Sequence, residues 1–541
     1  MRKIVLVFIL LLFVFMSCKK EKDTPSTPQP TPQLKVDSTS LRLSGNKGDM
    51  DSFTVQFSGN WSIAVNPSSV TWLKLSKSSG TGTTKIYVTV EQDNTNEVAQ
   101  IATIVITPNG EASKAINIPV TQEIFKLNFN ILWKYTIGGS ANDFLSGITR
   151  TEDGGYIAVG RTTSNNGDFS GNKGQLDAWI YKMDANGSKQ WQKLIGGSHN
   201  DHLYSITKSS DGNYVVVGQT NSNDGDIRGL HSQRAGTISD ALLIKITPSG
   251  QVLWQKTLGG YSEEYMGYDI VATTDGGCVF AVTTDSNDGD VAGNHGDSDA
   301  WVVKLDTQGE IVWQKTLGGS SSDFVYSIIR STDEGYVIAG WTTSNDGDVS
   351  GNHGSGDIWV VKLSADGNKL WQKTLGGTRG EVGFSIIENT SGNYIVVGRT
   401  SSNDGDVSGY LGGMYDIWVV NLNKSGNMVW QKTLGGTGAE TGLSIAASED
   451  GGCVIAGQTN SKEGNVSGFD KATDVVIVKV DGNGNKVWQK ALGGSDLDLV
   501  GKILSNGDGS YLLTVNTVSN DGDMSGNHGG SDAWVIKFKA N

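Results

Sequence analysis

The chain of 541 residues has little cysteine, little proline, an excess of acid over base and no long amphipathic helical pattern. Its three cysteines exclude a disulfide framework or a cysteine-rich metal site. The 43 Lys and Arg residues are outnumbered by 57 Asp and Glu residues, which leaves a net charge of −14. Because binding to nucleic acid needs clustered basic side chains, this balance argues against a nucleic-acid partner.

Glycine is abundant, at 73 residues, and Val, Ile, Trp and Thr are also frequent. β-Branched and aromatic residues favour strands, whereas glycine favours tight turns. The composition therefore predicts an all-β fold. The chain is too long for one ordinary core, so several domains or a repeat architecture are expected.

The N-terminus has a basic start, an apolar run over residues 4–15, and then Met-Ser-Cys ending at Cys18. The run is too short to span a bilayer comfortably and suits the core of a signal peptide. The pattern resembles a bacterial lipoprotein signal, although Phe15 replaces the usual aliphatic residue. The resemblance implies that residues 1–17 are removed and that a lipid on Cys18 anchors the protein at the outer membrane or cell surface. An ordinary signal peptide with a chance cysteine is the alternative.

Residues 18–33 are rich in Thr and Pro, which predicts an extended spacer. Residues 34–123 show short alternating strand patterns separated by Gly, Asn and Ser, which predicts an immunoglobulin-like sandwich.

Four pieces of this segment, Gly-Asn-Trp at 59–61, Trp-Leu at 72–73, Ser-Gly-Thr-Gly at 79–82 and Val-Thr-Gln at 120–122, resemble the BACON domain family. That family is found at the N-terminus of Bacteroidota surface proteins, and the resemblance implies carbohydrate binding. Trp61 and Trp72 are the aromatic residues that could stack on sugar rings. Core packing of both tryptophans, with the domain as a spacer, is the alternative.

Residues 127–541 contain seven copies of the marker Trp-Gln-Lys-x-Leu-Gly-Gly or a near variant, spaced by about 60 residues. Each full repeat holds four strand patterns, which is typical of a propeller blade. The first copy has only a fourth strand, and the chain ends on a third-type strand over 532–540. The two ends are therefore predicted to complete one blade. The expected fold is a seven-bladed β-propeller closed by pairing of its N- and C-terminal strands.

An acidic residue follows the second marker glycine by four positions in every repeat, and it opens the predicted first strand. The set comprises Asp143, Asp201, Glu264, Asp323, Glu381, Glu440 and Asp498. One interpretation is an acidic ring around a mouth of the propeller that attracts cations. The other is a structural contact repeated in each blade, with lysines on the third strands (Lys182, Lys245, Lys304, Lys362, Lys479 and Lys537) as partners.

The loop between the second and third strands places oxygen side chains at positions one, three, five and twelve, a spacing similar to an EF-hand calcium loop. The candidate calcium ligands are Asp288, Asp290, Asp299, Asp346, Asp348, Ser350, Asp357, Asp521, Asp523, Ser525 and Asp532. Because Asn-Asp-Gly forms turns by itself, a hydrogen-bonded surface turn is the alternative.

No nucleophile–base set, phosphate loop or zinc-protease motif stands out, and whether the protein is an enzyme stays open. Cys278 and Cys453 occupy places where other repeats have Tyr, which indicates packing residues. The sequence favours a membrane-anchored binding or scaffolding module with a glycan or protein ligand. The alternatives are a secreted polysaccharide-acting enzyme with its site at the propeller mouth and a purely architectural envelope protein. Trp341, Tyr410 and Tyr415 lie outside the repeat positions and are candidate glycan contacts.

Overall fold

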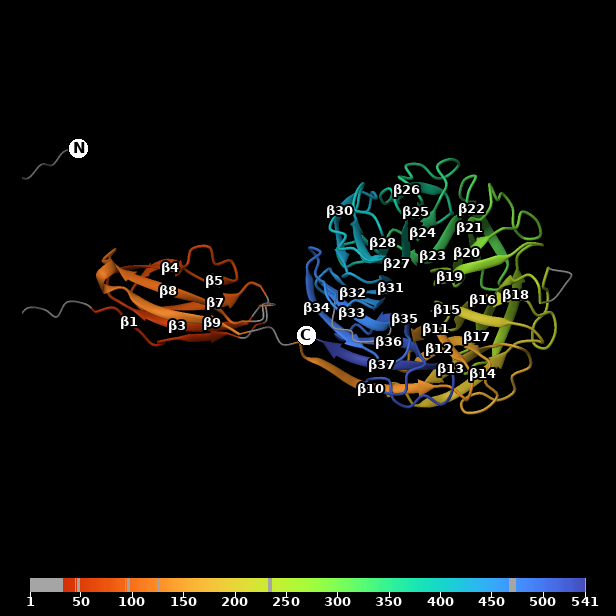
Figure 1. The fold of residues 1–541 in the computed structure, drawn as a ribbon, viewed down its shortest axis with the longest axis horizontal. Helices are drawn as coiled ribbons and strands as arrows, with labels where there is room; N and C mark the ends of the chain where they lie inside the picture. Colours follow the sequence, from red (N-terminus) through yellow and green to blue (C-terminus); the bar gives the residue numbers. More distant parts are fainter. Residues whose placement is uncertain are drawn as a thin grey trace, which may run out of the picture. The chain divides into compact units, whose positions relative to one another are not determined.

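The computed structural model describes residues 33–541 except 44, 46–48, 93, 95–97, 124–126, 232–235, 467–472 and 541. The predicted signal peptide, Cys18 and nearly all of the predicted spacer lie outside the described residues. The chain divides into two compact units, Met1–Lys126 and Leu127–Asn541 (Figure 1). Within the described ranges, no helix has the length and apolar character needed to cross a membrane.

Two sheets form the N-terminal unit. The first has the order β1-β3-β7-β5 and the second the order β2-β9-β8-β4-β6. The strands are β1 (Lys35–Val36), β2 (Leu41–Leu43), β3 (Met50–Gln56), β4 (Asn60–Asn66), β5 (Leu73–Leu75), β6 (Ser79–Thr81), β7 (Thr84–Val90), β8 (Gln100–Pro108) and β9 (Ile116–Gln122), with a short 3-10 turn η1 (Ala112–Lys114) before β9.

Alternate residues of these strands point inward, so both sheets contribute to one apolar core. Trp61 and Trp72 belong to this core and are 2% and 5% exposed. The Trp61 ring also lies so close to Gly80 that a Cβ there would approach it to 2.4 Å. Both tryptophans are therefore packing residues, and the alternative of stacking on sugar rings does not fit their burial.

The C-terminal unit is a ring of seven four-stranded antiparallel sheets around an axis (Figure 1). Blades 1 to 3 are β11 (Asp143–Arg150), β12 (Tyr156–Thr162), β13 (Asp177–Met183) and β14 (Lys189–Ile195); β15 (Asp201–Lys208), β16 (Tyr214–Thr220), β17 (Asp240–Ile246) and β18 (Val252–Leu258); and β19 (Glu264–Ala272), β20 (Cys278–Thr284), β21 (Asp299–Leu305) and β22 (Ile311–Leu317).

Blades 4 to 6 continue the pattern. They are β23 (Asp323–Arg330), β24 (Tyr336–Thr342), β25 (Asp357–Leu363) and β26 (Lys369–Leu375); β27 (Glu381–Glu388), β28 (Tyr394–Thr400), β29 (Asp416–Leu422) and β30 (Met428–Leu434); and β31 (Glu440–Ala447), β32 (Cys453–Thr459), β33 (Asp474–Val480) and β34 (Lys486–Leu492).

Blade 7 is built from both ends of the unit. It consists of β35 (Asp498–Ser505), β36 (Ser510–Thr517), β37 (Asp532–Ala540) and, as its outermost strand, β10 (Phe129–Ile137). Strand β10 pairs antiparallel with β37, from Phe129 opposite Ala540 to Ile137 opposite Ala533. The predicted all-β, seven-bladed propeller closed by its terminal strands is confirmed.

Tryptophans of two kinds hold the blades together. Those on the third strands, such as Trp359, are almost fully buried between neighbouring sheets. The marker tryptophans on the fourth strands lie further out, and five of them donate a hydrogen bond to a turn of the next blade. For example, the Trp371 indole N–H donates to the carbonyl of Lys424 at 3.1 Å. The buried indole N–H of Trp313 has no partner among the described residues. The repeated marker is therefore a blade-to-blade contact.

Candidate functional site

The acidic residue that opens each first strand is completely buried in all seven blades. In blade 4, Asp323 accepts hydrogen bonds from the backbone N–H of Gly319 and the hydroxyl of Ser344, both at 2.7 Å. The hydroxyl of Thr342, at the end of the second strand, also donates to it. Equivalent donors serve the acids of other blades. This geometry supports a structural contact rather than an exposed ring that attracts cations.

The lysines of the third strands do not pair with these acids, so that part of the prediction is wrong. Lys362 instead pairs with Asp333, in the turn between the first and second strands, at 2.5 Å. The same ion pair recurs in four other blades, as Lys182–Asp153, Lys245–Asp211, Lys304–Asp275 and Lys479–Asp450. The turn acid is far along the strand from the buried acid. Each repeat contains several acids, and the lysine pairs with the turn acid rather than with the acid that opens the first strand.

A second carboxylate lies beside each buried acid, at the start of the third strand. One of its oxygens, Oδ1, has no hydrogen-bond partner among the described residues. In all seven blades this residue is an aspartate: Asp177, Asp240, Asp299, Asp357, Asp416, Asp474 and Asp532. The first marker glycine makes room for it, because a Cβ on Gly435 would meet Asp416 Oδ1 at 2.3 Å and Glu440 Oε2 at 2.7 Å.

Burial raises the pKa of several of these paired carboxyls. It raises the pKa of Asp416 to about 6, with a smaller contribution from the charge of Glu440. It also raises the pKa of Asp201 to about 6 and that of Glu264 to about 7. Two carboxyls that share one buried space favour keeping a proton between them. Burial and the neighbouring carboxyl therefore shift the pKa values of Asp416, Asp201 and Glu264 upward, toward neutral pH.

The proposed calcium loops use their carboxylates for separate contacts. In blade 4, Asp348 pairs with Lys369 at 2.5 Å, and Asp357 accepts from Nδ1 of His353 at 2.6 Å. Asp346 accepts from the backbone N–H of Ser320 at 2.7 Å. These contacts are those of a hydrogen-bonded turn. In the part of the chain that the structure describes, no group of three or more His, Cys, Asp or Glu side chains is arranged to hold a metal ion. Calcium binding stays an untested prediction.

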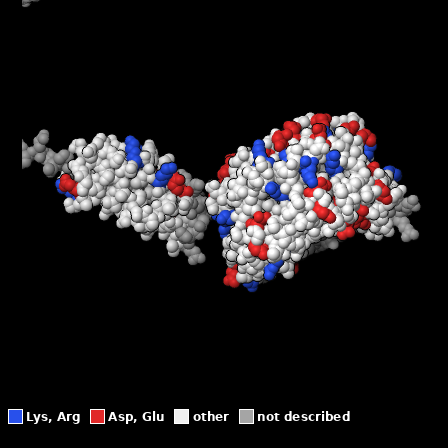
Figure 2. All heavy atoms as spheres, turned by 90° about the horizontal axis from the view of Figure 1, so that it is seen from above, with Lys and Arg blue, Asp and Glu red and all other residues white. Residues whose placement is uncertain are grey.

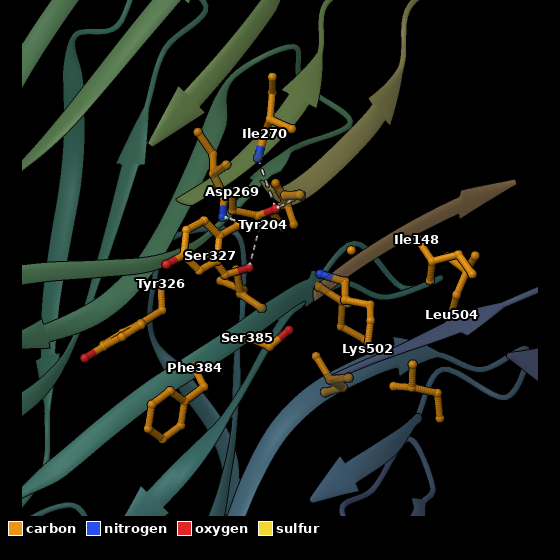
Figure 3. Close-up of a pocket in the computed structure, with 18 of the residues that line it drawn as sticks. Ile148, Tyr204, Asp269, Ile270, Tyr326, Ser327, Phe384, Ser385, Lys502 and Leu504 are labelled. Atoms are coloured by element: carbon orange, nitrogen blue, oxygen red, sulfur yellow. Dashed lines mark hydrogen bonds between the residues drawn. The ribbon is translucent and has the colours of Figure 1, made fainter. Parts of the chain in front are cut away.

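A cavity of about 510 Å³ lies on the propeller axis (Figure 3). The first strands of all seven blades line it, but the residues they contribute differ. Blades 2 to 5 provide an aromatic arc, which we define as Tyr204, Tyr268, Tyr326 and Phe384. The rings of Tyr204 and Tyr268 stack at 4.9 Å between centroids, and those of Tyr326 and Phe384 lie 5.1 Å apart. Apart from Lys502, blades 6, 7 and 1 provide small or aliphatic residues.

Two charged residues line the same cavity. Asp269 accepts hydrogen bonds from the hydroxyls of Ser205 and Ser327, at 2.7 and 3.2 Å, and from two backbone N–H groups. The ammonium group of Lys502, in contrast, has no hydrogen bond or ion pair with any described residue. The cavity thus combines aromatic faces, serine hydroxyls and one unpaired cation. These are groups that orient a small polar ligand.

Ser146 and His202 form a contact that the sequence pattern did not reveal, because they lie on different blades. Ser146 Oγ is 2.8 Å from Nε2 of His202, and an Arg161 nitrogen is 3.1 Å from Nδ1. An arginine only donates hydrogen bonds, so Nδ1 accepts and the ring proton sits on Nε2. Burial lowers the pKa of His202 well below its usual value, which keeps the ring neutral. Nε2 therefore donates to Ser146 and does not activate it as a nucleophile.

The two cysteines are not reactive either. Cys278 and Cys453 are fully buried in blade cores, as the packing interpretation requires. Burial raises the pKa of each thiol to about 12. A thiol that stays protonated is a poor nucleophile.

The candidate glycan contacts outside the repeat positions are all half-buried. Trp341 stacks on Phe324, with 5.1 Å between centroids. The Tyr410 hydroxyl donates to the carbonyl of Gly413 at 2.8 Å. Tyr415 lies under the guanidinium of Arg399, which is 4.1 Å from the ring centroid. Of the three, Tyr415 is next to the cavity, because Arg399 also contacts the ring of Phe384 at 5.7 Å.

No protein-family model matches the chain. Regulatory protein FlaEY of Caulobacter vibrioides is 25% identical over 222 residues, which cover 38% of this chain and 22% of that protein. An uncharacterized WD repeat-containing protein, L264 of Acanthamoeba polyphaga mimivirus, is 21% identical over 458 residues, covering 66% of this chain and 33% of that protein. The chain thus spans a third or less of the length of these curated relatives.

Solved propellers are similar at low identity. The WD40 domain of Neurospora crassa Pan2 aligns with 76% of this chain and 95% of its own, at 11% identity and a TM-score of 0.40. YCF48 bound to a D1 peptide aligns with 76% of this chain and 97% of its own, at 11% identity and a TM-score of 0.41. A polysaccharide lyase, an ulvan lyase, aligns with 75% of this chain and 95% of its own, at 10% identity and a TM-score of 0.45.

Proposed function

We propose that this protein is a surface-anchored binding module whose glycan or protein ligand occupies the cavity on the propeller axis. The observation that carries the proposal is the aromatic arc. The rest of each blade repeats closely, yet the residues facing the axis differ from blade to blade. A cavity with aromatic residues on one side can orient a bound ligand, and a purely architectural ring does not need this asymmetry.

A catalytic role has less support. The Ser146–His202 contact has the wrong tautomer for proton abstraction from the serine. Asp269 is the acidic residue lining the cavity, and four donors already occupy its oxygens. The polysaccharide-acting enzyme is therefore the second candidate, and cleavage of a bound glycan by the wild-type protein would restore it.

The anchoring part of the proposal rests on the N-terminal sequence. A diacylated or triacylated Cys18 would hold the protein to the outer membrane, with the spacer and the sandwich as a stalk. Replacing Cys18 with alanine should move the protein from the detergent-extracted membrane fraction to the soluble fraction and abolish labelling by a radioactive fatty acid. Unchanged membrane association of the Cys18→Ala variant would contradict lipid anchoring.

Variants of the aromatic arc test the binding site. A glycan array and a surface-protein array would first identify ligands of the wild-type protein. Tyr204→Ala and Tyr326→Ala should then weaken binding of each ligand by about fivefold or more, since one stacking contact contributes about 1 kcal/mol or more. Tyr87→Ala is the matched control, because Tyr87 is an exposed tyrosine of the sandwich, 45% accessible. Binding that survives both arc variants would place the site elsewhere.

A further inference from the structure

Arg399, on β28, has a guanidinium that no described residue satisfies. It lies 4.1 Å from the Tyr415 ring centroid and 5.7 Å from that of Phe384. No hydrogen bond and no ion pair joins this guanidinium to any described residue, and its Nε is buried without a partner. The aromatic rings contact the flat faces of the guanidinium, whereas the N–H groups at its edge have no acceptor among the described residues.

Blade 1 carries the same residue at the same register position, where Nε is likewise buried without a partner but another guanidinium nitrogen has one. Arg161 is paired across its blade with Phe144, as Arg399 is with Val382. An Arg161 nitrogen bonds Nδ1 of His202 at 3.1 Å, and its guanidinium lies over the Phe144 ring at 4.7 Å. The other five blades have Gln219, Thr283, Trp341, Gln458 and Asn516 at this position. An arginine is therefore not required by blade packing.

Arg399 does not line the cavity itself, but it contacts residues that do. Two residues that line the cavity are its neighbours. The ring of Phe384 contacts the guanidinium directly. Burial raises the pKa of Tyr326, and the nearby positive charge of Arg399 partly opposes that rise. In the register of β27, Val382 precedes Phe384 by two residues toward the strand start. Arg399 is thus one step closer than Phe384 to the propeller face that carries the Tyr415 loop.

The chemistry of an unsatisfied arginine is specific. Its planar N–H fork matches the paired oxygens of a carboxylate or sulfate. Beside it, the aromatic arc offers ring faces, serine hydroxyls line the cavity, and Lys502 supplies a second unpaired cation. A sugar ring has an apolar face that fits an aromatic ring and hydroxyls that bond serine. An acidic peptide would place its carboxylates on flexible arms and leave the arc unfilled.

We propose that Arg399 binds the anionic group of an acidic sugar whose ring lies against Phe384 and Tyr326. The anion is the carboxylate of a uronic acid or the sulfate of a sulfated sugar, since both present oxygens to the same fork. This inference rests on the proposed binding function and specifies its ligand class.

The test uses the full-length protein in detergent and calorimetric titration with three probes. These are tetragalacturonic acid, its complete methyl ester and a sulfated galactan tetrasaccharide without carboxylates. The wild-type protein should bind one or both charged probes and not the ester. Arg399→Gln should weaken that binding about ten- to hundredfold, as expected for loss of charge-assisted hydrogen bonds. Arg399→Lys keeps the charge without the fork and should lose less.

Arg330→Gln is the matched control, because Arg330 pairs with Glu334 in a turn outside the cavity lining. Thermal melting of each variant shows whether it is folded. If Arg399→Gln does not fold, the binding measured for Arg399→Lys still tests the inference. Equal binding of the acid and its ester, or unchanged binding by Arg399→Gln, overturns the inference. So does failure of the wild-type protein to bind either charged probe. The proposed function fails separately, if variants of Tyr204 and Tyr326 leave the binding of every array ligand unchanged.

Discussion

The ends of the blades and the lining of the axis follow opposite rules in this propeller. At the blade ends, the same contacts recur around the ring: buried acid with glycine and hydroxyl donors, turn aspartate with lysine, marker tryptophan with the next blade. Along the axis, equivalent positions hold Ser146, Tyr204, Tyr326, Phe384, Leu443 and Gly501. Contacts between neighbouring blades must form at all seven junctions of the ring, whereas contacts with one ligand need to form at one place. The difference separates residues that determine stability from residues that determine recognition.

Acidic and basic side chains are interspersed on the side of the propeller shown in Figure 2. No single charge sign dominates that surface, although the chain carries a net charge of −14. Lys502 lines the cavity, whereas Arg399 contacts the ring of Phe384, which lines it. Both cations are half-buried, where a charge interacts more strongly than at an exposed surface.

Removal of β10, residues 129–137, should have the largest effect. Blade 7 would keep three strands, and the edge of β37 would lose its partner over the whole register. We expect loss of the cooperative melting transition and association between molecules through the exposed edge. Calorimetry and size-exclusion chromatography would measure both. A monomeric deletion variant with an unchanged melting temperature would show that ring closure contributes little.

A substitution in the repeated framework should cost more stability than one at the axis. Trp359, 1% exposed, packs between blades, and its indole N–H donates to the Gln372 side chain at 3.2 Å. Trp359→Ala should lower the free energy of unfolding by about 3 to 5 kcal/mol, because it leaves a large cavity. Urea denaturation measures this loss, with Trp61→Ala in the sandwich as a comparison that should leave the propeller transition unchanged.

The buried acid pairs should make the propeller less stable as the pH rises. The pKa of Asp416 is about 6 in the folded chain, above its usual 3.8, so its proton adds stability at low pH. That contribution is lost as pH rises from about 4 through about 6. Asp416→Asn, which keeps a neutral group beside Glu440, should therefore stabilise the protein by about 2 kcal/mol at pH 8 and by much less at pH 4. Equal effects at both pH values would contradict proton sharing.

At the axis, the expected effect on stability is the smallest. Tyr326 is half-buried and faces the cavity, so Tyr326→Ala should change the free energy of unfolding by less than about 1 kcal/mol. The same variant should lose ligand binding. A large loss of stability would show that the aromatic arc belongs to the framework and would weaken the contrast between the two regions.

The fold could be predicted because repetition makes each signal appear seven times. The orphan fourth strand near Trp133 and the unpaired third strand at 532–540 were sufficient to predict how the ring closes, and the pairing of Phe129 with Ala540 confirms it. The partner of each lysine could not be chosen in the same way. Several acids accompany Lys362 in its repeat, among them Asp323 and Asp333, and only the strand register shows that the turn residue Asp333 is the closer of these two.

The candidate site was harder to predict, for a related reason. The sequence search looked for residues that recur, so it found the buried acids and the loop aspartates. The residues that line one side of the cavity, such as Tyr204, Phe384 and Lys502, do not recur from blade to blade. Tyr415 was identified as a departure from the pattern, but its contact with Arg399 depends on a loop and a strand meeting in space. Positions on the first strands where the residue type changes from blade to blade are the signal that would have located the cavity.

The pairing of β10 with β37 also has a consequence for biosynthesis. Phe129 meets its partner Ala540 only after roughly 400 further residues have been made, which takes on the order of a minute at common elongation rates. Until then the nascent chain has an unfinished sheet at its start. A product truncated before β37 never closes, and its open edge marks it for proteolysis or aggregation. Closure of the propeller therefore depends on synthesis of both β10 and β37.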